Sequence, residues 1–115
     1  MAAGQYDITC EQGATFALTL QWQDENEAAI DLTGYAVRMH VRKTVKTTST
    51  IIELTTANSR VLLTPLTGTI ALALTATETA GIADSGVYDI ELVSGAGVVT
   101  RILEGKFTLS REVTR

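Results

Sequence analysis

Any chemistry in this sequence has to be built around very few residues. The chain of 115 residues has one histidine, His40, and one cysteine, Cys10. A general base at His40 would need an orienting carboxylate and a nucleophile, and no motif in the sequence supplies either. Zinc sites built from clustered cysteine and histidine are excluded by these counts. We therefore interpret His40 as an exposed strand histidine and expect a protein that is not an enzyme, with no catalytic residue, metal or cofactor.

Basic side chains are concentrated in one segment of an otherwise acidic chain, whose formal net charge is −4. The acidic balance argues against nucleic acid as a partner, because phosphate binding needs a positive field. One hypothesis is a docking surface for an acidic patch on a neighbouring protein, since charge complementarity sets register and encounter rate. The alternative is that these residues protect an edge strand from stray pairing. The candidate docking residues are Arg38, His40, Arg42, Lys43 and Lys46.

Two loops resemble ligand sites only superficially. Asp24, Glu25 and Glu27 gather carboxylates as a Ca²⁺ site would, but calcium loops alternate ligands with spacers and include a glycine for the sharp turn. We interpret this loop as a solvated hairpin tip. The segment Ser94-Gly95-Ala96-Gly97 lacks the Lys-Ser/Thr ending of a phosphate loop and lies between expected strands. We interpret it as a hairpin turn.

The elements that position these residues are strands. Apolar and polar side chains alternate with period two, which puts one set in a core and the other in water. The same alternation predicts that Cys10 is buried. Further short strands are expected over 51–55 and 60–64, with turn signals between the runs. The apolar positions of the clearest runs are Tyr6, Ile8, Cys10; Phe16, Leu18, Leu20, Trp22; Tyr35, Val37, Met39, Val41; Ile70, Leu72, Leu74; and Tyr88, Ile90, Leu92.

This pattern predicts one all-β domain over residues 1–115, an antiparallel β-sandwich of about 7–9 strands. Thr75 and Glu78 have the spacing of a capping box, so a short helical turn is expected near 76–80. The last strand changes parity, and a β-bulge near Ile102 and Leu103 would restore its inward phase. The apolar runs are too short to span a membrane as a helix, and the N-terminus lacks the features of a secretion signal. We expect a protein made in the cytoplasm.

The segment Asp84-Ser85-Gly86-Val87-Tyr88 resembles the tyrosine corner of immunoglobulin-like domains. By that resemblance Asp84 and Tyr88 form a structural corner, in which the Tyr88 hydroxyl bonds backward to backbone and pins the crossing between the two sheets. Ile90 stands where an immunoglobulin has its second cysteine, so the disulfide between the sheets is absent.

Over nearly its whole length the sequence is similar to the immunoglobulin-like domain of phage baseplate upper proteins and related tail-associated proteins. The fragments that carry the likeness are Gly13-Ala14-Thr15-Phe16, Ile30-Asp31-Leu32-Thr33-Gly34-Tyr35, Val41-Arg42-Lys43, Leu74-Thr75-Ala76-Thr77-Glu78-Thr79-Ala80, Val87-Tyr88-Asp89-Ile90-Glu91-Leu92, Glu104-Gly105-Lys106-Phe107-Thr108-Leu109-Ser110 and Glu112-Val113-Thr114. Such domains attach larger modules to a virion and are not enzymes.

The resemblance implies a structural component of a bacteriophage virion, a baseplate, tail or decoration subunit that docks on neighbouring virion proteins. It would be present in many copies or as a homo-oligomer, made in the host cytoplasm and found in the virion, with no nucleic acid or membrane partner. The alternative is a carbohydrate-binding or adhesion module, which would need a row of exposed aromatic residues or an exposed Trp22. An enzyme would be favoured by a pocket that contains His40 beside a carboxylate.

Overall fold

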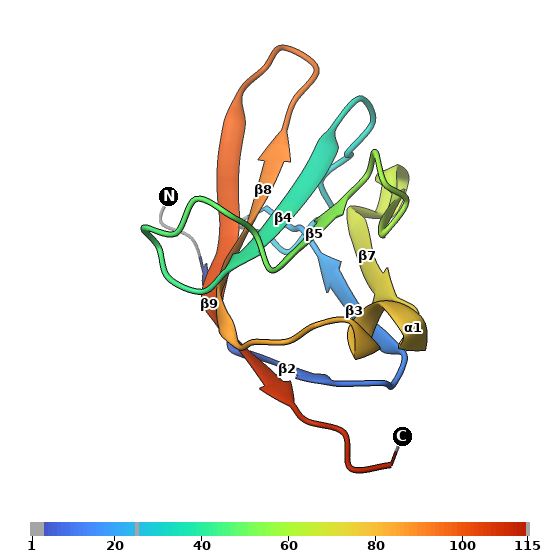
Figure 1. The fold of residues 1–115 in the computed structure, drawn as a ribbon. Coiled ribbons are helices and arrows are strands. Elements are labelled where there is room, and N and C mark those ends of the chain that lie inside the picture. The colour runs from blue at the N-terminus through green and yellow to red at the C-terminus, as the bar shows by residue number, and fades with distance from the viewer. Residues whose placement is uncertain (1–3, 25, 115) are drawn as a thin grey trace.

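The computed structural model describes residues 4–24 and 26–114, and these residues form a β-sandwich (Figure 1). Nine strands and two short helical segments follow one another along the described chain. They are β1 (Gly4–Gln5), β2 (Ile8–Glu11), β3 (Phe16–Gln21), β4 (Ala36–Arg42), β5 (Ile52–Thr55), β6 (Val61–Thr64), the 3-10 turn η1 (Pro65–Thr67), β7 (Thr69–Leu74), α1 (Ala76–Ala80), β8 (Gly86–Val93) and β9 (Val99–Ser110). The all-β class is confirmed.

The strands form a larger and a smaller sheet. The larger sheet has the order β1-β9-β8-β4-β5, with β2 also pairing with β9, and the smaller has the order β3-β7-β6. These orders match the G-F-C-C′ and B-E-D sheets of an immunoglobulin-like sandwich. An antiparallel sandwich was predicted, but β1 and β2 both run parallel to β9. The prediction is corrected for these two strands.

The core lies between the sheets and is built from the predicted alternation. Val37, Met39 and Val41 of β4 are each at most 1% exposed, and their neighbours Ala36 and Arg38 face solvent. Ile90 and Leu92 of β8 are fully buried beside them. An inward apolar side chain at every second position seals the interior, because each strand presents alternate residues to opposite faces of its sheet.

Local signals in the sequence produce the expected irregularities. Ile90 pairs with Leu103 and Glu91 pairs with Arg101, so Ile102 is the extra residue of a β-bulge in β9. This insertion lets Phe107 and Leu109 face the core at the far end of the strand. The predicted bulge is confirmed.

The predicted helical turn is also confirmed as α1. The Thr75 hydroxyl accepts the Glu78 N–H at 3.1 Å, and the Glu78 carboxylate accepts the Thr75 N–H at 2.8 Å, which completes the capping box. The Thr79 side chain is fully buried, and its hydroxyl donates to the Ala14 carbonyl at 2.8 Å. The turn is thereby tied to the segment that leads into β3.

Tyr88 is a buried anchor, but it pins a different element from the one expected. Its hydroxyl donates to the Tyr6 carbonyl in the link between β1 and β2, which is a bond backward to backbone but not one across the two sheets. Gly105 lies directly opposite Tyr88 in β9, and a side chain there would collide with the Tyr6 carbonyl. The missing side chain lets the N-terminal segment lie close to β9. The corner expectation is therefore corrected, because both partners belong to the larger sheet.

The end of β8 near Asp84 is held by a different residue. The Ser85 hydroxyl accepts the Leu109 N–H at 2.8 Å, which joins the start of β8 to the end of β9. Asp84 itself makes no hydrogen bond or ion pair with the described residues. Ser85, its neighbour in the Asp-Ser-Gly segment, therefore fixes the start of β8, where Asp84 was expected to belong to the corner.

Candidate functional site

Charged side chains cover the outer face of the larger sheet, over β5, β4, β8 and β9. We call these residues the charged face. Each points outward because its strand neighbours fill the core. The charged face comprises Arg38, His40, Arg42, Glu53, Asp89, Glu91, Arg101, Glu104 and Lys106. It therefore carries four cations and four carboxylates around one histidine.

The register of the strands arranges these charges in rows. One row runs across the sheet through Arg38, Glu91 and Arg101, which are successive cross-strand partners. Opposite charges in directly facing positions stabilise a sheet, and Arg38 Nε lies 2.7 Å from Glu91 Oε1. Arg101 turns instead to the next row, where its Nε lies 3.4 Å from Asp89 Oδ2.

The neighbouring row is acidic. It runs through Glu53, His40, Asp89 and Glu104, each opposite the next across a strand pair. Burial and the adjacent Glu91 raise the pKa of Asp89, while the charge of Arg101 acts against this rise. A third row follows on its other side, through Arg42, Val87 and Lys106. The acidic row is therefore a line of carboxylates between two rows that carry basic side chains.

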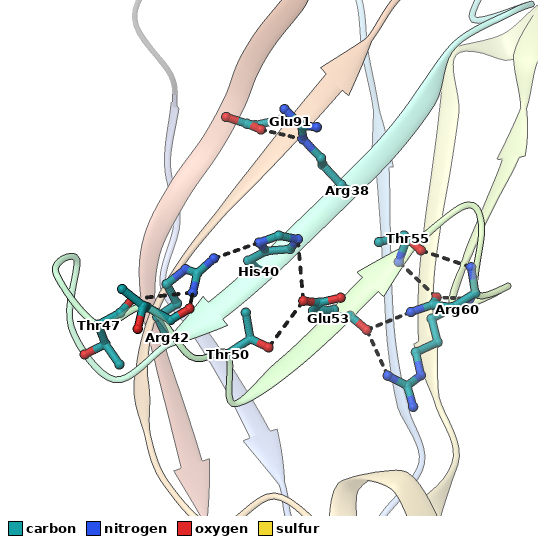
Figure 2. Close-up of polar contacts among 11 residues, drawn as sticks. Arg38, His40, Arg42, Thr47, Thr50, Glu53, Thr55, Arg60 and Glu91 are labelled. Carbon is teal, nitrogen blue, oxygen red and sulfur yellow. Dashed lines mark hydrogen bonds and ion pairs between the residues drawn. The ribbon is translucent and has the colours of Figure 1, made fainter.

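His40 is held between a cation and an anion (Figure 2). Its Nδ1 lies 3.2 Å from an Arg42 guanidinium nitrogen, and its Nε2 lies 4.0 Å from Glu53 Oε1. A guanidinium only donates, so Nδ1 must be the accepting nitrogen and the proton of the neutral ring belongs on Nε2. His40 is thus oriented by its neighbours, and its basic nitrogen is occupied by Arg42.

Arg42 also fixes the loop that follows its strand. Its guanidinium donates to the backbone carbonyls of Thr47 and Thr48, and the loop closes on itself through the hydroxyls of Thr44 and Thr47, 2.8 Å apart. Lys43 and Lys46 lie exposed in this loop and make no hydrogen bond or ion pair with the described residues. Their ammonium groups are available to a partner.

A hollow of about 410 Å³ lies on the charged face between β4, β8 and β9. Its wall contains His40 beside Asp89 and Glu91, together with Arg42, Arg101 and Glu104. A pocket that contains His40 beside a carboxylate, the feature that would favour an enzyme, is therefore present. Within the described residues, however, the Tyr88 hydroxyl is bonded to Tyr6, and Cys10 is buried in the core. The hollow is lined mainly by charged side chains, which suits recognition of a charged group.

The sequence correctly placed Arg38, His40 and Arg42 on one outward face. The other two predicted docking residues, Lys43 and Lys46, lie in the loop at the end of that face. The interpretation as protection of an edge strand is wrong for β4, because β4 lies between β8 and β5. The carboxylates and Arg101 were missed as parts of the site. Their outward parity was readable, but the register that joins them to β4 was not.

The acidic loop forms a turn. Asp24 Oδ1 accepts the N–H groups of Asn26 and Ala28 at 2.8 and 3.0 Å, and Glu27 has a positive φ of 63°. Glu25 lies outside the described residues. No cluster of three metal-ligating side chains occurs in the described part of the chain.

Comparison with known proteins gives no relative from which a role for these residues could be taken. No family model matches the chain, and no curated protein matches it either. In the described residues no helix is long and apolar enough to cross a membrane.

Proposed function

We propose that this chain is a non-enzymatic structural subunit of a bacteriophage virion that docks on neighbouring virion proteins through the charged face and the loop with Lys43 and Lys46. The similarity to phage tail-associated domains supports the virion role. The observation that carries the docking surface is the set of charge rows across β5, β4, β8 and β9. Rows of alternating sign reward one register of a partner and penalise others.

The structure separates two kinds of basic residue in this surface. Arg38 and Arg42 are engaged within the chain, with Glu91 and with the loop carbonyls respectively. Lys43 and Lys46 are exposed and make no bond with the described residues. We assign the lysines to direct contact with an acidic partner and the arginines to holding the surface in shape.

The alternative as a carbohydrate-binding or adhesion module has weaker support. Trp22 is partly buried and packs edge-on against Tyr35, with ring centroids 6.1 Å apart. Tyr6, in the link between β1 and β2, is 49% exposed and is the one exposed aromatic residue of the described chain. A row of aromatic side chains for stacking on sugars is not formed by these residues.

The test is incorporation of charge variants into particles. Lys43→Glu combined with Lys46→Glu should strongly reduce the amount of the protein in purified particles, because two docking cations become anions. Arg111→Glu is a control, since Arg111 lies beyond the end of β9 and belongs neither to the charged face nor to the loop with Lys43 and Lys46. Unchanged incorporation of the double lysine variant, with the fold intact by circular dichroism, would overturn the docking proposal.

A further inference from the structure

Among the described residues, strand β3 forms an open edge of the smaller sheet. It pairs with β7 on one side and is the terminal strand of the order β3-β7-β6. The Trp22 N–H donates to Gly68 at 2.8 Å, and the register continues this pairing through Leu20, Leu18 and Phe16. Because bonded and non-bonded pairs alternate along an antiparallel ladder, Ala17, Thr19 and Gln21 direct their backbone N–H and C=O groups away from β7. These groups form a row ready to pair with another strand.

The other sheet edges carry features that discourage pairing. Strand β6 has four residues and runs into Pro65, which has no N–H to donate. Strand β5 also has four residues and carries Glu53. The edge formed by β1 and β2 is short, interrupted, and carries Asp7 and Glu11. Charge, proline and short length are the usual protections of edge strands.

Strand β3 has none of these protections. Its six residues are Phe-Ala-Leu-Thr-Leu-Gln, and the sequence from Gln12 to Gln23 contains no charged residue and no proline. No register shift interrupts its pairing with β7. An uncharged, regular edge of this length is a template for strand addition.

The inward side of β3 is also incompletely covered. Phe16, Leu18 and Leu20 remain partly exposed, whereas the inward apolar side chains of β4 and β8 are at most 4% exposed. A hollow of about 120 Å³ beside the end of β3 is lined by Leu20, Gln21, Trp22, Ile70, Ile102 and Leu103. An added strand would therefore gain both backbone hydrogen bonds and apolar contacts.

We propose that β3 pairs with β3 of a second copy of this chain, antiparallel across a two-fold axis at Thr19. This inference concerns a different surface from the charged face and does not depend on the virion role. In this register Thr19 faces Thr19 of the second copy, and Ala17 faces Gln21. On the inward side Leu18 faces Leu20 and Phe16 faces Trp22, next to the hollow.

Self-pairing suits this edge because a two-fold axis brings like residues together. Identical charges facing each other would repel, and β3 has none. A shift of one residue would turn the apolar side chains of one copy to the outer face, so the alternation excludes it. The axis at Thr19 is the one that pairs the outward backbone groups of Ala17, Thr19 and Gln21 with one another. The product is a continuous sheet with the strand order β6-β7-β3-β3-β7-β6.

The proposal is tested by the mass of the purified chain in solution and by charge variants at Thr19. Light scattering over about 10 µM to 1 mM should show twice the 12.3 kDa of one chain at the upper concentrations. Thr19→Lys and Thr19→Glu should each be monomeric, because each places like charges together on the axis. Mixing the two variants should restore the dimer. Thr64→Lys, on the same outer face at the β6 edge, should leave it intact.

Amide hydrogen exchange gives a reading that needs no variant. The Ala17, Thr19 and Gln21 amides should exchange quickly in dilute samples and slowly in concentrated ones. A wild-type chain that stays monomeric throughout, or a dimer that survives Thr19→Lys with these amides unprotected, overturns the proposal.

Discussion

The two outer faces of the sandwich differ in the charge of their side chains. The charged face over β5, β4, β8 and β9 carries eight ionic groups around His40. The face over β3, β7 and β6 carries no charge on its strands, only small or uncharged side chains. These are Ala17, Thr19, Gln21, Leu62, Thr64, Thr69, Ala71 and Ala73.

This difference separates two kinds of recognition. Many charges of the charged face are already paired with one another, so a partner gains binding energy there only if it offers matching charges. The uncharged sheet is satisfied within itself but ends in the open edge of β3, where any extended strand can bond to the backbone. Under the two proposals, the first surface selects partners by charge and the second by strand geometry. Together they predict that one small domain binds two different neighbours at once.

The largest predicted difference between the two sheets is in the stability lost when an inward side chain is truncated. Ile90→Ala beneath the charged face should lower the free energy of unfolding by about 2–5 kcal/mol, because Ile90 is fully buried. Leu18→Ala in β3 should cost clearly less in the monomer, since Leu18 is already partly exposed. Urea unfolding of both variants, under conditions that keep them monomeric, measures the difference. Equal losses would show that the β3 edge is not open.

A second test concerns the link that carries β1 and β2 against the larger sheet. Tyr88→Phe should cost about 1 kcal/mol, the usual net contribution of one hydrogen bond, by removing the bond to Tyr6. Burial raises the pKa of Tyr88. The folded state therefore keeps the phenol protonated, and stability is retained below the unfolded pKa of about 10 and falls as the pH rises beyond it.

The alkaline loss of stability should be smaller in the Tyr88→Phe variant than in the wild type. Unfolding curves at several pH values between about 8 and 11 bracket the unfolded-state pKa and make this comparison. Parallel loss in both proteins would mean that Tyr88 does not contribute to alkaline unfolding.

Much of this layout could be predicted from the sequence because its causes are local. Alternation gave Met39 and Ile90 as core residues, the Thr75–Glu78 spacing gave α1, and the change of parity gave the bulge at Ile102. Each depends on neighbours within a few positions along the chain. The same alternation also put Arg38 and His40 on an outward face.

The remaining features depend on residues far apart in the sequence. The parallel pairing of β2 with β9, and the bond from Tyr88 to Tyr6, join the two ends of the chain. The partnership of Arg38 with Glu91 depends on the register between β4 and β8. Such registers are decided by packing of the whole core, so local patterns leave them open.

The ion pairs of the charged face should contribute little to folding. A double-mutant cycle with Arg38→Ala and Glu91→Ala should give a coupling of about 0.2–1 kcal/mol, because the pair is substantially exposed to solvent and is screened. Thermal unfolding in low and high salt measures it. A much larger coupling would make the charged face a stabilising device and would weaken its assignment as a docking surface.

The smallest expected effect is at Asp89. Its raised pKa means that ionisation is disfavoured in the folded chain, so stability decreases as the pH rises through its titration. Asp89→Asn should therefore raise the free energy of unfolding at neutral pH, by less than about 1 kcal/mol because the group is partly solvated. The gain should vanish in acid, where the wild-type carboxyl is protonated. A loss of stability at neutral pH would show that the Arg101 contact outweighs burial.

The most direct test of the central claim is the protein content of purified phage particles. The proposed function predicts that a phage encodes this chain and that quantitative mass spectrometry of its purified particles finds the chain as an intact component in many copies per particle. Its absence from purified particles, with the protein abundant in the surrounding lysate, would contradict a structural role in the virion.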